Sequence, residues 1–132
     1  MWVNTGLIWA LRIVTQQLVI EDVKIGLYTN AVAWNPATVF GDLVEPVESG
    51  YAQQLCSGWN SPIITGGNQG DVAGLNVTFT DSDVTDIVAI GFFYIGATTG
   101  TLLGGDQFVT PQTIPNSGGI LLIQPQALDT SM

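Results

Sequence analysis

The run of residues 87–95 restricts the fold of this chain more than any other segment. It reads Ile-Val-Ala-Ile-Gly-Phe-Phe-Tyr-Ile, so both sets of alternate side chains are apolar. Successive side chains of a β-strand point to opposite faces of the sheet, so a strand of this composition presents apolar surface on both sides. We therefore expect it in the interior of a sheet that is covered on each face, or at a contact between subunits.

Shorter runs in the rest of the chain also have strand patterning. Residues 23–29 predict a half-buried strand with Val23, Ile25 and Leu27 on one face. Further short strands are expected at 49–58, 63–65, 75–80, 101–103, 107–109 and 120–123. Glycine- and proline-rich segments separate them, and 66–74 and 111–119 are expected to be loops. Because the connections are too short for helical crossovers, we predict antiparallel sheets in a mainly β fold, a β-sandwich or jelly-roll-like domain spanning residues 21–132.

Residues 1–20 have a different period and predict an N-terminal amphipathic helix or arm. Apolar residues recur at spacings of four, four, three and four, at Val3, Leu7, Leu11, Val14 and Leu18. Asn4 is the expected N-cap. Two interpretations stay open: the stripe packs on its own domain, or it docks on a neighbouring subunit. A signal peptide or membrane span is disfavoured, because Arg12 lies inside the stretch and no positive charge precedes Trp2.

Charge restricts the partners that this chain can bind. Its 132 residues include two basic and eleven acidic side chains, for a formal net charge of −9. A protein that grips a phosphate backbone needs several lysines or arginines, and Arg12 and Lys24 are the only two here. We therefore predict no nucleic-acid partner and no attachment to an anionic membrane.

The absence of histidine removes much of enzyme chemistry. No serine or cysteine nucleophile can be paired with an imidazole, and no histidine zinc site can form within the chain. The single cysteine, Cys56, has no disulfide partner within the chain and is expected to be a small buried residue. A carboxylate hydrolase remains an alternative, but a chain of this size is not expected to form the required cleft. We predict a protein that is not an enzyme and has no cofactor.

Two further motifs each allow a functional and a structural interpretation. Residues 81–86 carry three carboxylates in six residues, as calcium loops often do, but lack the remaining ligands and the glycine of an EF-hand. A solvated hairpin turn without metal is the prediction. Trp34 and Trp59 flank loops, where exposed aromatic rings can stack on sugars. Burial in a core or an interface explains both residues equally well and is the prediction.

The chain resembles small structural proteins found among bacteriophage virion genes, whose expected role is capsid decoration, also called cement. The resemblance covers nearly the whole chain and lies in the order of these segments: Asn4-Thr5-Gly6, residues 24–30, Gly50-Tyr51-Ala52, Trp59, Pro62, Thr78-Phe79-Thr80, residues 90–93, residues 100–103 and Gln107-Phe108. It implies a small β-sandwich or jelly-roll protein on the outer capsid surface, trimeric, that clamps contacts between major capsid subunits. It brings no catalytic residues.

The expected partners are therefore the major capsid protein and further copies of this chain in a homotrimer. For the interface we predict these residues of the helix and the central strand: Trp2, Leu7, Leu11, Val14, Ile90, Phe92 and Tyr94. The opposite face of the strand is expected to fill the core with Ile87, Ala89, Phe93 and Ile95. The alternative function is a tail, neck or fibre component that binds a glycan on the host surface.

Overall fold

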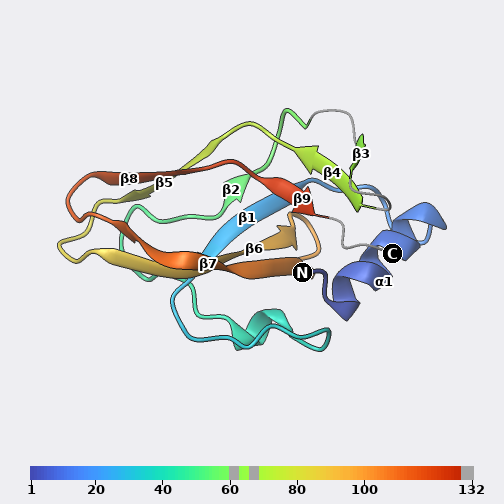
Figure 1. The fold of residues 1–132 in the computed structure, drawn as a ribbon, viewed down its shortest axis with the longest axis horizontal. Helices are drawn as coiled ribbons and strands as arrows, with labels where there is room; N and C mark the ends of the chain where they lie inside the picture. Colours follow the sequence, from blue (N-terminus) through green and yellow to red (C-terminus); the bar gives the residue numbers. More distant parts are fainter. Residues whose placement is uncertain (60–62, 66–68, 129–132) are drawn as a thin grey trace.

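The computed structural model describes the backbone of residues 1–59, 63–65 and 69–128 and the side chains of residues 1–59 and 73–126. This part of the chain is mainly β, with one N-terminal α-helix, as predicted (Figure 1). The elements in chain order are α1 (Asn4–Val14), β1 (Val23–Tyr28), the 3₁₀ turn η1 (Phe40–Asp42), β2 (Gln54–Leu55), β3 (Ile63–Thr65), β4 (Gln69–Ala73), β5 (Val77–Asp81), β6 (Ile87–Gly96), β7 (Leu102–Ile114), β8 (Gly119–Ile123) and β9 (Gln126–Leu128).

The strands pair antiparallel in three sheets. Their orders are β2-β1-β6-β7, β3-β4-β9 and β5-β8. Strand β6 pairs with β1 on one edge, from Val23 opposite Gly96 to Tyr28 opposite Gly91, and with β7 on the other. The apolar run 87–95 therefore lies inside a sheet, which confirms the prediction made from its composition.

Apolar side chains cover both faces of the four-stranded sheet. The first core cluster consists of Ile25, Leu27, Cys56, Val77, Phe79, Ile87, Ala89 and Ile114. The second core cluster consists of Val3, Tyr28, Leu43, Phe93, Ile95 and Leu102. In Figure 1 the segment with η1 lies on one side of this sheet, and β5, β8 and β9 lie on the other. Strand β1 contributes to both clusters, so the prediction that it is buried on one face only is wrong.

The face pattern of β6 changes along the strand. Its pairing with β7 is irregular between Ala89 and Gly91. Ile87 and Ala89 belong to the first core cluster, whereas Phe93 and Ile95 belong to the second. The four residues predicted to share one core face are therefore divided between two clusters. Bulges and similar irregularities redirect side chains in this way, because an unmatched residue breaks the two-residue repeat.

Other predicted boundaries also change. Strands β5 and β6 belong to different sheets, so residues 82–86 connect two sheets and the segment 81–86 does not form a hairpin turn. Residues 69–73 form β4 where a loop was predicted, while 66–68 lie outside the described residues. Strand β7 continues through Pro111 to Ile114, and Pro111 is tolerated because it lies in the irregular stretch 108–111, which has no paired residue in β6. The strand expected at 49–58 is reduced to β2.

The start of α1 is held by tertiary hydrogen bonds, because no side chain caps it. Asn4 is the first helical residue and Val3 occupies the N-cap without a side-chain hydrogen bond, so the prediction of Asn4 as N-cap is wrong. The Val3 N–H donates to the Leu103 carbonyl (3.1 Å), and the Asn4 N–H donates to the Pro36 carbonyl (2.8 Å). These bonds satisfy two of the N–H groups at the helix start that have no partner within the helix.

Gly6 permits the close contact between α1 and β7. It is the buried residue of the helix, and a Cβ at this position would lie 2.1 Å from the Leu103 carbonyl oxygen. A backbone atom cannot move aside as a flexible side chain can. The absence of a side chain at residue 6 therefore sets how closely the helix approaches the sheet.

We predict that Gly6→Ala lowers the free energy of unfolding by about 1–3 kcal/mol, the usual cost of overpacking, although alanine is the better helix former. Gly41→Ala is the matched control, because a Cβ there meets no atom within 4 Å. Urea denaturation of both variants and the parent chain measures the difference. Equal stability of the two variants would contradict the proposed contact.

Candidate interaction surfaces

The apolar stripe of α1 faces away from the rest of the chain. Its members, here called the helix stripe, are exposed by 50% to 78%: Leu7, Ile8, Leu11 and Val14. They occupy about a third of the helix circumference. The opposite side, with Gly6 buried and Trp9 and Ile13 partly buried, rests on β7. The helix thus packs on its own domain, but through the face that the sequence stripe did not mark.

Sequence reasoning missed Ile8 as a member of the stripe. It lies next to Leu7 and three residues before Leu11, so the helical repeat places it on the same side. The apolar spacing in the sequence could have shown that Ile8 belongs to the stripe. The sequence does not show whether this side of the helix faces the sheet or the solvent, because that depends on the contact at Gly6.

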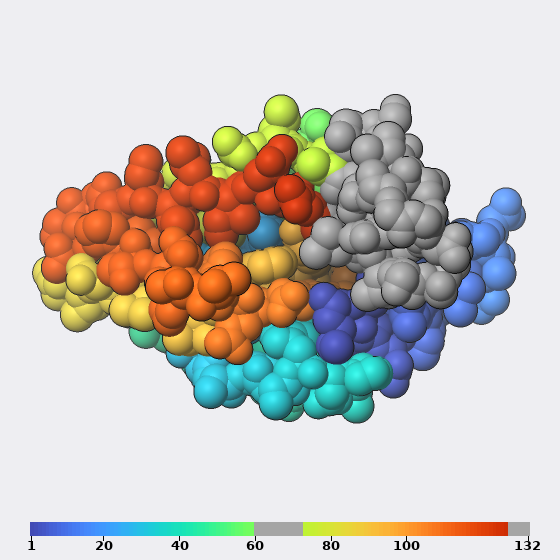
Figure 2. Space-filling model, in the orientation of Figure 1, coloured from blue at the N-terminus to red at the C-terminus, as the bar shows by residue number. Residues whose placement is uncertain are grey.

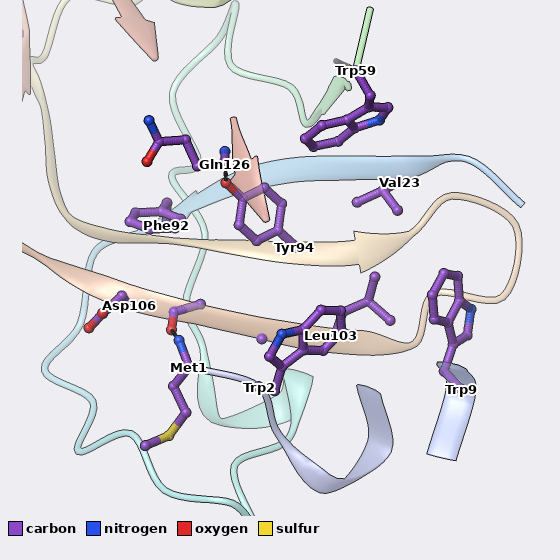
Figure 3. A pocket seen from close by; sticks show the side chains of 12 residues that line it. Met1, Trp2, Trp9, Val23, Trp59, Phe92, Tyr94, Leu103, Asp106 and Gln126 are labelled. Carbon is purple, nitrogen blue, oxygen red and sulfur yellow. Dashed lines mark hydrogen bonds between the residues drawn. The ribbon is translucent and has the colours of Figure 1, made fainter. Parts of the chain in front are cut away.

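The predicted residues Trp2, Phe92 and Tyr94 come together at a pocket of about 90 Å³. We call it the aromatic pocket after its rings: Trp2, Trp9, Trp59, Phe92 and Tyr94. Figure 3 shows Tyr94 and Trp59 on one side of this space, Trp2 across from them and Trp9 at one end. Sequence reasoning did not place Trp9 and Trp59 here, because they come from α1 and from the segment after β2.

Ile90 does not join the other two residues predicted on its strand. It packs, partly buried, against the second core cluster, whereas Phe92 and Tyr94 pack against the first. The prediction that these three side chains share one contact face is therefore wrong. The irregular pairing between Ala89 and Gly91 lies within this stretch and accounts for the separation.

Backbone pairing places Trp2 beside β7. Trp2 forms a β-bridge with Gly104, and the Met1 carbonyl accepts a hydrogen bond from the Gly105 N–H (3.0 Å). A Cβ on Gly104 would lie 2.1 Å from that carbonyl oxygen. The first residues therefore lie along the outer edge of β7, which requires a residue without a side chain at position 104.

Hydrogen bonds hold two of the rings in place. The Tyr94 hydroxyl accepts a bond from the Gln126 N–H (2.8 Å), and the Trp9 indole N–H donates to a Glu21 carboxylate oxygen (3.0 Å). The Phe92 and Tyr94 rings meet edge to face, with centroids 5.7 Å apart at 75°. Phe92 and Tyr94 therefore form a corner of aromatic surface on β6, and Trp9 is held separately on α1.

The ionisation of the groups around the pocket follows from their surroundings. Burial raises the pKa of Tyr94 to about 12, so its hydroxyl is neutral near pH 7. Desolvation opposes ionisation of Glu21, but hydrogen bonds from Thr99, Trp9 and Thr98 outweigh it and hold its pKa below the ordinary value. The carboxylate behind Trp9 is therefore charged near neutrality.

The carboxylates of residues 81–86 hold loop backbone. Asp83 accepts hydrogen bonds from the N–H groups of Val84 (2.7 Å) and Ser49 (3.2 Å), which lower its pKa. Asp86 accepts one from the Asn116 N–H (2.8 Å). Asp81 is fully buried, which contradicts a solvated turn, and its Oδ1 accepts from the Asp83 N–H (2.9 Å). Among the described residues, no three or more cysteine, aspartate or glutamate side chains gather to hold a metal ion.

The two loop tryptophans have different surroundings. Trp34 packs on the second core cluster, and its indole N–H donates to the Tyr28 hydroxyl (2.9 Å). Trp34 is therefore the one that packs against the core. Trp59 is 37% exposed and lines the aromatic pocket, so of the two it is the one that a ligand can reach.

A scan against protein-family models and a search of curated proteins found no match to this chain. Within the described residues, no helix is both long and apolar enough to cross a membrane.

Cys56 is 4% exposed, and burial raises the pKa of its thiol to about 12. Since the thiolate is the reactive form, we predict that a disulfide reagent at pH 8 labels the native protein far more slowly than the urea-unfolded chain. The stabilising effect of burying the neutral thiol is complete below the ordinary pKa of 9.0 and is lost as pH rises toward 12. The free energy of unfolding should therefore fall over that range, and fall less in Cys56→Ala. Labelling at the same rate in native and unfolded chains would contradict this.

Proposed function

We propose that this chain is a bacteriophage virion structural protein that decorates the outer surface of the capsid as a cement protein. In this role it binds the major capsid protein and further copies of itself as a homotrimer, and it catalyses no reaction. The observation that carries the proposal is the helix stripe, a contiguous apolar face on a helix already docked through its other side. A soluble chain gains stability by covering such a face with a partner.

The size of the exposed apolar surface supports a protein contact. Burial of apolar surface contributes about 25 cal/mol per Å², and a specific interface buries about 800 Å² on each partner. The helix stripe alone is smaller than that. Beyond α1, Val19 and Ile20 are 84% and 81% exposed, so the segment 1–20 offers apolar contacts past the end of the helix.

Charge supports a place on the outside of the particle. A formal net charge of −9 repels packaged nucleic acid, which also carries negative charge. The low share of charged residues, 10%, leaves contacts that depend mainly on apolar burial and neutral hydrogen bonds. Attachment of this kind changes little with salt concentration.

We further propose that the sheets are arranged as a β-sandwich of the jelly-roll kind. Val77 and Phe79 of β5 share the first core cluster with Ile25 and Leu27 of β1, so side chains of two sheets meet in one core. The connection 82–86 passes from one of these sheets to the other. Both features are expected where two antiparallel sheets pack face to face.

A tail, neck or fibre component that binds a host-surface glycan is the second candidate. The ring of Trp59, which is 37% exposed, favours it, because an exposed ring can stack on a sugar at the protein surface. Counting this polypeptide by quantitative mass spectrometry in particles of the encoding phage separates the two. Hundreds of copies per particle support a position on the shell, a dozen or fewer support the neck or tail, and absence from the particle rejects both.

We predict that the double variant Leu11→Gln/Val14→Gln folds normally, because both side chains are exposed, but binds capsids and its own copies about tenfold more weakly or worse. Burying an aliphatic side chain contributes about 1.5–3 kcal/mol, and each 1.4 kcal/mol changes affinity tenfold. Co-sedimentation with capsids lacking the protein, and native mass spectrometry of the free protein, measure the two effects.

The control for this experiment is Val109→Gln. Val109 is fully exposed on β7, outside α1, so the substitution places the same polar side chain on exposed apolar surface elsewhere. Unchanged capsid binding and unchanged oligomeric state in the helix variant, with Val109→Gln as reference, would contradict a contact through the helix stripe.

A further inference from the structure

We propose that the aromatic pocket binds an organic cation of the quaternary ammonium class, such as the trimethylammonium group of choline. This site goes beyond the proposed function and does not depend on it, because no member of the helix stripe lines the pocket. Trp9 is its residue from α1, and the rest come from residues 1–2, the segment after β2, and strands β1, β6, β7 and β9.

The first argument is the arrangement of the rings. Five aromatic side chains from four separate parts of the chain line one space of about 90 Å³. Phe92 and Tyr94 meet at 75°, so they present a corner and not a flat platform, and Trp2 lies across from them (Figure 3). A cation is attracted to the faces of aromatic rings, and a space lined by rings on several sides can offer it more than one such contact.

The second argument is the charge around the pocket. Among the described residues that line it, Asp106 is acidic and no lysine or arginine is present. Glu21 is held ionised behind Trp9, with a carboxylate oxygen 3.0 Å from the indole nitrogen. The amino group of Met1 is the other charged group at this site, and it donates to the Gly105 carbonyl (2.8 Å). The carboxylates, together with a formal net charge of −9 over the chain, favour a positive ligand.

The third argument is the small number of hydrogen-bonding side chains. Apart from Asp106 and Gln126, the described side chains that line the pocket are apolar or aromatic. The Trp9 indole N–H already donates to Glu21, and the Tyr94 hydroxyl accepts the Gln126 N–H and keeps its own O–H donor. A sugar or a lysine ammonium loses several hydrogen bonds to water when it enters such a space. A quaternary ammonium group has no N–H or O–H donor, so it loses no donated hydrogen bonds, and ring contacts and the nearby carboxylates offset the desolvation of its charge. The chemistry of the walls therefore selects an alkylated cation.

The test compares two probes of nearly equal shape. Choline and its neutral isostere 3,3-dimethyl-1-butanol are titrated into the full-length protein, with tryptophan fluorescence and calorimetry as readouts. We expect saturable binding of choline and about 2- to 30-fold weaker binding of the isostere, which corresponds to the range of cation–π attraction. Equal or tighter binding of the isostere would show a merely apolar pocket and overturn the proposal. So would the absence of saturable choline binding, or a preference for glucose over choline.

Variants then locate the site. Trp59→Leu removes an exposed ring, and Asp106→Asn removes a charge while keeping an acceptor for the Gln107 N–H that Asp106 now binds (2.8 Å). Each is expected to weaken choline binding about 2- to 30-fold without changing the binding of the isostere to the same degree. Trp34→Phe is the control, because Trp34 packs on the second core cluster, and it should leave choline affinity unchanged. Choline affinity that responds to Trp34→Phe and not to Trp59→Leu would place the cation elsewhere and refute this assignment.

Discussion

The structure depends on the placement of one apolar strand, β6, between two neighbouring strands of the same sheet. Strand β6 pairs along both edges, with β1 and β7, and its side chains enter core clusters on both sides of the sheet. A strand of this kind requires cover on each face, since an uncovered apolar face would remain in contact with water. The strand β5 supplies cover on one side, and Val3 and Leu43 supply it on the other. The remaining elements are arranged around this requirement.

Burial of the sheet face that carries the second core cluster also determines where the N-terminal segment lies. Val3 is fully buried in the second core cluster, and the residues beside it pair with the edge of β7. The helix that follows starts in a position already set by these contacts and approaches the sheet at Gly6. Its apolar stripe is left outward as a consequence, while Trp2 and Trp9 are brought to the rings of β6. One set of backbone contacts thus produces both candidate interaction surfaces.

The two surfaces suit different partners for a physical reason. The helix stripe is convex and aliphatic, so it gains from contact with another apolar surface of similar extent. The aromatic pocket is concave, is lined by five rings and has carboxylates nearby, which is why we propose an organic cation as its ligand. Because the chain has few charged side chains, the electrostatic potential at each surface depends mainly on the few charged groups close to it. A structural role for one surface and ligand binding at the other are therefore compatible in a single small protein.

Composition and spacing alone determined the mainly β class, the N-terminal helix, the interior position of residues 87–95 and the burial of Cys56, because these follow from local periodicity and from apolar content. Only tertiary structure decided which side of the helix meets the sheet, since this depends on the approach of Gly6 to Leu103. It also decided that Ile90 separates from Phe92 and Tyr94 and that Trp9 and Trp59 join them, because irregular pairing and contacts between distant segments leave no periodic trace in a sequence.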